Sequence, residues 1–117
     1  CRKRGIKVTN TPDVLTEDVA DAALGLILMT GRGFVRLDRF LRAGKWLQGG
    51  PELTTRLGGQ KVGILGLGRI GKAIARRCHY GFDMEVVFHN RSKVDDPGLP
   101  ARQVEMAEAM AAVLASS

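Results

Sequence analysis

Aromatic residues are scarce in this chain. Phenylalanine, tryptophan and tyrosine together make up 5% of its 117 residues, which leaves few rings on which nucleic acid bases could stack. The formal net charge is +6, but the basic residues are spread along the sequence and cluster only in the short segment Cys1–Arg4. Both observations argue against a nucleic-acid-binding domain. A phosphorylated small molecule is an equally good partner for this charge.

Cysteines and long apolar runs are also few. Cys1 and Cys78 lie far apart, and His79 and His89 lack the spacing of zinc ligands, so neither a disulfide framework nor a metal site is predicted. The longest apolar stretch, Val19–Met29, is too short to span a bilayer, and no signal peptide is visible. We therefore expect no membrane association and a reducing, cytoplasmic compartment.

The most informative stretch begins at Lys61. Val62–Leu65 is a short apolar run that predicts a buried strand. Apolar residues then recur at helical spacing: Ile70, Ala73, Ile74 and Cys78. Between strand and helix lies the pattern G-x-G-x-x-G, a weak signal alone but typical of dinucleotide binding in this context. The alternative is a glycine-rich turn that binds nothing, and the flanking elements favour binding.

Each glycine of this pattern has a physical role. Gly66 permits the tight turn, Gly68 lets a pyrophosphate approach the backbone, and Gly71 lets helix and strand pack closely. The phosphates would lie on free N–H groups at the helix start, where the helix dipole favours negative charge. The cofactor-binding residues predicted here are Gly66, Leu67, Gly68, Arg69, Ile70 and Gly71.

A second group of predicted cofactor ligands follows the next strand, expected at Glu85–Phe88. NAD-preferring proteins of this kind carry a carboxylate about 20 residues beyond the glycine turn. Here that position is Asn90, followed by Arg91 and Ser92. Arginine offers a planar set of donors that matches a phosphate. We therefore predict that Asn90, Arg91 and Ser92 bind the ribose end of the cofactor and that NADPH is preferred, with NAD possible. A polar turn that merely ends the strand is the alternative.

The remaining elements are read from periodicity and turn residues. Residues 5–9 alternate apolar and polar side chains and predict a short strand. Thr16 is the expected N-cap of a helix over about residues 17–30, and that helix is apolar on nearly all sides, so we expect it to be buried on most of them. A second helix should end near Ala43, with Gly44 at its C-cap and an arginine face that is either solvated or packs on a partner. Residues 46–59 read as loop.

One more helix is predicted toward the C-terminus. Its apolar residues recur at helical spacing: Val104, Ala107, Met110, Ala111 and Leu114. The resulting order of strand, helix, strand and helix implies a parallel sheet. The predicted fold class is α/β, a partial Rossmann-like doubly wound parallel sheet. Two parallel strands need cover on both faces, so we expect the chain to be a fragment.

Taken together, four segments resemble the D-isomer-specific 2-hydroxyacid dehydrogenases, most closely the glyoxylate/hydroxypyruvate reductase branch. They are Gly5–Thr16, Val19–Asp21, Arg39–Trp46 and Gly63–Gly71. The resemblance implies an enzyme that reduces a small 2-oxo acid with a nicotinamide cofactor. It also implies that residues 1–15 end the substrate (catalytic) domain and that residues 16–117 begin the NAD(P)-binding domain. The apolar helix would cross between domains, and an arm over about residues 32–59 would pack in a homodimer.

The resemblance implies no catalytic residue within this chain. The family's catalytic arginine, carboxylate and histidine belong to stretches expected beyond Ser117, and neither His79 nor His89 matches that histidine. We therefore expect the chain alone to be inactive. One alternative is a cofactor-binding regulatory protein of corepressor type, since the family has such members. The match over Thr9–Thr16 to the reductase branch argues against it.

Overall fold

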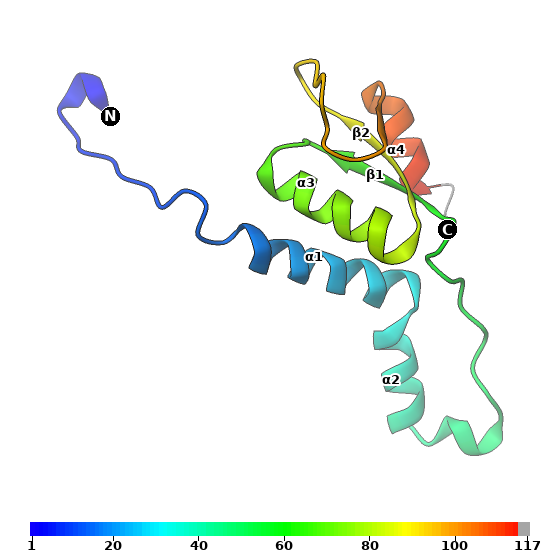
Figure 1. Ribbon diagram of the computed structural model, residues 1–117. Coiled ribbons are helices and arrows are strands. Elements are labelled where there is room, and N and C mark those ends of the chain that lie inside the picture. Colours follow the sequence, from blue (N-terminus) through cyan, green and yellow to red (C-terminus); the bar gives the residue numbers. More distant parts are fainter. Residues whose placement is uncertain (115–117) are drawn as a thin grey trace.

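The computed structural model describes residues 1–114 and shows a small α/β body from which two segments extend (Figure 1). Four helices and three strands make up the regular structure. In chain order they are α1 (Thr16–Gly31), α2 (Phe34–Arg42), β1 (Lys61–Leu65), α3 (Arg69–Arg76), β2 (Glu85–His89), β3 (Ala101–Gln103) and α4 (Met106–Leu114). Short 3₁₀ turns occupy Arg2–Arg4 and Lys45–Gln48, and a π-helical turn, Arg77–Gly81, continues α3.

The three strands form one parallel sheet in the order β1-β2-β3. Leu65 lies opposite His89, and Phe88 lies opposite Gln103, so the residues that follow β1 and β2 emerge at the same edge of the sheet. β3 was not expected from the sequence. Its three residues, Ala101–Gln103, contain no apolar run, and only pairing with β2 makes them a strand.

Helices cover both faces of this sheet. On the face toward α3, the core contains Ile64, Val86, Phe88 and Ala75. On the opposite face, the buried residues are Val87, Val104 and Ala109, with α4 against β1 and β2. Successive β2 side chains thus point to alternate covered faces, which explains the unbroken apolar run in that strand. The predicted α/β, Rossmann-like arrangement is confirmed.

Helix α1 lies alongside α3 in Figure 1. Arg77, the first residue of the turn that continues α3, contacts α1 through its side chain. Its Nε donates to Asp21 Oδ1 and its Nη2 donates to Glu17 Oε2, each at 2.7 Å. The hydrogen bond to Glu17 makes the largest contribution and that to Asp21 the next largest, and both raise the pKa of the Arg77 guanidinium. We call these three residues the Arg77 clamp.

The burial expected for α1 on most sides is not supplied by the described residues of this chain, and the remaining cover is expected from a second domain or a second subunit. Ala20 is the one α1 residue that is fully buried, while Leu26 is 63% exposed and Met29 is 41% exposed. The helix packs on α3 along one side and leaves its other sides open. No helix in the described part of the chain has the length and apolar character needed to cross a membrane.

Two predictions for the N-terminal segment are also wrong. Residues 5–9 form no strand, because no neighbouring strand lies beside this segment to pair with it (Figure 1). Thr16 is not an N-cap: α1 begins at Thr16 itself, Leu15 takes the cap position, and no side chain caps the helix. Glu17 and Asp18 lie in the first turn of α1, where the helix dipole favours carboxylates.

The segment over residues 32–59, which we call the arm, extends away from the sheet (Figure 1). α2 ends with Ala43 at its C-cap, and Gly44 follows with φ +69°, a conformation that favours glycine. The 3₁₀ turn Lys45–Gln48 overlaps the start of the loop predicted over residues 46–59. Apolar side chains on the arm are open to solvent, with Leu47 91% and Leu53 96% exposed.

Helix α4 begins at Met106, two residues later than predicted. Val104, which precedes it, is buried as expected. The predicted apolar stripe is wrong at Ala107, Met110 and Ala111, which are all exposed. Met110 is 51% exposed, whereas Ala109 is fully buried. Ala109 joins Val87 and Val104 in the core on the face of the sheet toward α4. Leu114 is in the helix, and its side chain lies outside the described set.

Candidate cofactor site

The glycine turn joins β1 to α3 and has the backbone geometry that its sequence predicts. Gly66 has φ +94°, which a residue with a side chain rarely adopts. Its N–H donates to the carbonyl of His89 at 2.8 Å, which ties the turn to the end of β2. A Cβ at Gly71 would lie far inside the van der Waals contact distance to the Gly66 carbonyl oxygen. Close packing therefore requires glycine at position 71.

The middle glycine differs from the other two. A Cβ at Gly68 would meet nothing within 4 Å, and its backbone is extended, with φ −79° and ψ −163°. The fold itself therefore has no requirement for glycine there. Open space directly above this backbone is what the approach of a pyrophosphate needs.

The start of α3 offers N–H groups to an anion. The first hydrogen bond into the helix runs from the Lys72 N–H to the Gly68 carbonyl at 2.9 Å, and no side chain caps this end. The N–H groups of the preceding turn residues, including Arg69 and Ile70, therefore have no acceptor within the helix. Leu67 can take part only through its backbone, because its side chain is 4% exposed and belongs to the core.

Arg69 has a partner that the sequence did not indicate. Its guanidinium forms an ion pair with Asp13 of the N-terminal segment, and both side chains are 63% exposed. Asp13 adopts φ +67°, which is unusual for a residue other than glycine. Nothing in the spacing of these two residues could have predicted their contact, because Asp13 lies in a stretch that is neither helix nor strand.

The second predicted group of ligands is a compact turn after β2. The Asn90 Nδ2 donates to the Ser92 carbonyl at 3.1 Å and to its Oγ at 3.2 Å. Arg91 is exposed and has no ion-pair partner in residues 1–114. Lys93, by contrast, pairs with Asp95 at 2.9 Å. Of the basic residues in this turn, Arg91 is thus the one available to an anion.

Both predicted groups lie at the carboxyl edge of the sheet, where parallel α/β sheets bind ligands. The shared edge follows from the register of Leu65 with His89. A cavity of about 400 Å³ opens beside the second group. Its lining is mostly polar and includes two carboxylates. The lining residues are His89, Asn90, Gln103, Val104, Glu105 and Glu108.

The two histidines and the buried cysteine have structural roles. The Nδ1 of His79 lies 3.1 Å from the Met84 carbonyl, and that of His89 lies 3.1 Å from the Val104 carbonyl. Burial raises the pKa of the Cys78 thiol, so a smaller fraction of it is in the reactive thiolate form. Within residues 1–114, no group of three or more potential ligands is placed to hold a metal ion.

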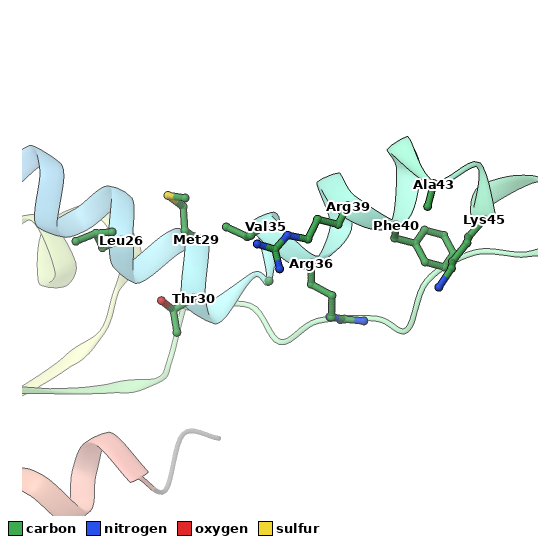
Figure 2. A pocket seen from close by; sticks show the side chains of 10 residues that line it. Leu26, Met29, Thr30, Val35, Arg36, Arg39, Phe40, Ala43 and Lys45 are labelled. Atoms are coloured by element: carbon green, nitrogen blue, oxygen red, sulfur yellow. The ribbon is translucent and has the colours of Figure 1, made fainter.

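A larger cavity of about 890 Å³ lies between α1 and the arm, away from the glycine turn. Figure 2 shows Leu26 and Met29 from α1 on one side and Val35 and Phe40 from α2 farther along. Arg36 and Arg39 lie between Val35 and Phe40. This groove mixes apolar surface with positive charge. It has no connection to the predicted cofactor ligands.

Comparison with known proteins assigns a family. The family model described as "D-isomer specific 2-hydroxyacid dehydrogenase, NAD binding domain" matches residues 24–117. Among curated relatives, a glyoxylate/hydroxypyruvate reductase A of Arabidopsis thaliana is 54% identical over 92 residues, or 79% of this chain and 29% of the relative. A glyoxylate reductase of Pyrococcus horikoshii is 47% identical over 100 residues, or 80% of this chain and 30% of the relative.

Solved structures agree with this assignment. The NADPH-dependent glyoxylate/hydroxypyruvate reductase of Sinorhizobium meliloti, in complex with NADP and malonate, matches with a TM-score of 0.79 and 44% identity. That match covers 94% of this chain and 34% of the other. The chain thus spans about a third of the length of the proteins that it matches.

Proposed function

Because this chain belongs to the D-isomer specific 2-hydroxyacid dehydrogenase family, we propose that the protein reduces small 2-oxo acids with a nicotinamide cofactor. Glyoxylate and hydroxypyruvate are the substrates named for its relatives. The observation that carries this proposal is the glycine turn, with its open backbone at Gly68 and its close contact at Gly71. The relatives described above are named reductases, which favours an enzyme over the regulatory alternative.

The residues present fit such a cofactor. Backbone N–H groups from Leu67 to Ile70 would hold the pyrophosphate at the start of α3, and Asn90–Ser92 would face the ribose. When bound, the cofactor supplies the hydride for the keto carbon. The chain's own contribution is to bind and orient. His79 and His89 both bond to backbone carbonyls, so neither is assigned to proton transfer.

The proposed cofactor is NADPH. Arg91 is exposed and unpaired within the described residues, and no carboxylate takes the place of Asn90 to repel a 2′-phosphate. A guanidinium forms charge-assisted hydrogen bonds with phosphate that are stronger than neutral ones. The NADPH-dependent reductase of Sinorhizobium meliloti is among the similar structures, which supports the same preference.

The double variant Asn90→Asp, Arg91→Ala of the full-length protein tests this preference. Losing a charge-assisted contact and adding a repelling carboxylate should lower the affinity for NADPH relative to NADH by roughly tenfold to a hundredfold. Dissociation constants for both cofactors measure the change. Lys93→Ala is the matched control, because Lys93 already pairs with Asp95, and it should leave the ratio unchanged. Wild-type protein that binds NADH more tightly would contradict the proposal.

We also propose that residues 1–15 end the substrate domain, that residues 16–117 begin the cofactor domain, and that two copies pack through the arm. Support comes from the extended N-terminal segment (Figure 1) and from the exposed apolar residues of the arm, including Trp46 at 58%. Apolar surface of this kind marks interaction sites. A cytoplasmic location is proposed as well, in keeping with two free thiols.

Replacing Leu47 and Leu53 with aspartate should dissociate the dimer. Both side chains are more than 90% exposed, so the change should not disturb the fold of a single copy. In a dimer interface each new aspartate would be a buried charge, and its desolvation would be costly. The mass measured by sedimentation at micromolar concentration should fall from that of two copies to that of one. Tyr80→Ser, which alters a side chain that is 63% exposed outside the arm, should remain dimeric. A wild-type protein that sediments as a monomer would refute the dimer.

A further inference from the structure

A single side chain on β3 determines the shape of the turn after β2. The Gln103 Nε2 donates to the Asn90 carbonyl at 3.2 Å and to the Ser92 carbonyl at 3.0 Å. Its Oε1 accepts from the Val94 N–H at 2.9 Å. The side chain is partly buried. Three hydrogen bonds from one amide therefore hold three backbone groups of a five-residue segment.

The chemistry of these partners requires glutamine or a close equivalent. Two carbonyls need donors and one N–H needs an acceptor. A primary amide supplies both kinds of group, and only one of its two orientations satisfies all three partners. A glutamate would keep the acceptor but would face two carbonyls without a donor. A methionine of similar length would offer neither, and would leave the Val94 N–H without its partner.

The register of the sheet explains why a residue so far along the chain reaches this turn. Gln103 pairs with Phe88 in the last position of the β2–β3 ladder, so it lies beside the end of β2, where the turn begins. Asn90 adds its own bonds to Ser92 from within the turn. The backbone on both sides of Arg91 is thereby fixed, while the Arg91 side chain stays free of any ion pair in the described residues.

We propose that Gln103 is a positioning residue for cofactor selectivity: it holds the Asn90–Val94 turn in the shape that presents Arg91 to a 2′-phosphate. This inference rests on the proposed preference for NADPH. A preorganised turn loses less conformational entropy when it binds an anion than a mobile one does. Because NADH has no 2′-phosphate for Arg91 to bind, the affinity for NADH depends less on the shape of this turn.

The variant Gln103→Met of the full-length protein tests the proposal with two measurements. First, the dissociation constant for NADPH should rise about tenfold and that for NADH less than twofold, since three hydrogen bonds hold the turn. Second, without any cofactor, hydrogen exchange at the Val94 amide should become at least tenfold faster. Arg102→Met is the matched control. It breaks the exposed pair with Glu108 at 2.8 Å on the neighbouring position of the same strand, and it should change neither quantity.

The outcomes separate this inference from the proposed function. Equal weakening of both cofactors, or unchanged exchange at Val94, would overturn the role of Gln103. Wild-type protein that prefers NADH would overturn the NADPH proposal and, with it, the selectivity role of Gln103. The Val94 exchange would then still decide whether Gln103 fixes the turn: accelerated exchange would support that part, and unchanged exchange would overturn it as well.

Discussion

Replacing Gly68 with valine is expected to abolish cofactor binding while the protein stays folded. A Cβ at this position meets nothing within 4 Å, and the extended backbone with φ −79° is one that valine adopts readily. The added methyl groups would instead fill the space in which the pyrophosphate approaches the backbone. Affinity for both NADPH and NADH should fall on the order of a hundredfold or more, equivalent to roughly 3 kcal/mol.

Two measurements make this prediction specific to the phosphates. The thermal unfolding midpoint of Gly68→Val without cofactor should match that of the wild type within about 2 °C. Both cofactors should weaken to the same extent, because the pyrophosphate is common to them. Gly68→Ala is a graded control with a smaller obstruction and should lie between wild type and valine. Unaltered binding by Gly68→Val would mean that the turn has another role.

Replacing Gly71 with alanine is expected to damage the fold itself. The new Cβ would overlap the Gly66 carbonyl oxygen, a backbone atom with no flexible side chain to move aside, and would press on Ile64 at 3.3 Å. Either α3 shifts away from β1 or the glycine turn distorts. Overpacking of this kind costs about 1–3 kcal/mol, and a shifted α3 also displaces the N–H groups proposed for the pyrophosphate.

The measurement for Gly71→Ala is therefore the free energy of unfolding together with cofactor affinity, and both should fall. Gly81→Ala is the matched control, because a Cβ at Gly81 meets nothing within 4 Å and its backbone is not left-handed. That control should retain both properties. If Gly71→Ala were as stable as the wild type, the close contact between α3 and the glycine turn would not exist in solution.

Local patterns were sufficient to predict the parts of the fold that are built from neighbouring residues. The strand at Val62–Leu65, the glycine turn and the helix after it follow from hydrophobic spacing and from backbone freedom at Gly66. The strand Glu85–His89 was predicted within one residue. These segments each bury side chains in a pattern that reflects their own geometry, so the sequence carries the information directly.

Features that depend on distant partners could not be predicted in this way. β3 has no apolar run and exists because β2 offers a free edge. Residues 5–9 alternate like a strand but have no neighbour to pair with. In the candidate site, the glycines and Arg91 follow from a motif and a count along the chain. The contacts of Asp13 with Arg69 and of Gln103 with the Asn90–Val94 turn join segments with no common pattern.

The Arg77 clamp has a consequence for the order in which the chain folds. It joins residues that are 56 and 60 positions apart, whereas β1, α3 and β2 follow one another within a single short stretch. Because closing a longer loop costs more entropy and local contacts form faster, the β1–α3–β2 unit should assemble first and α1 should dock onto it afterwards. The ion pairs of Arg77 would then be absent from the transition state for folding. They would act mainly by slowing the detachment of α1 during unfolding.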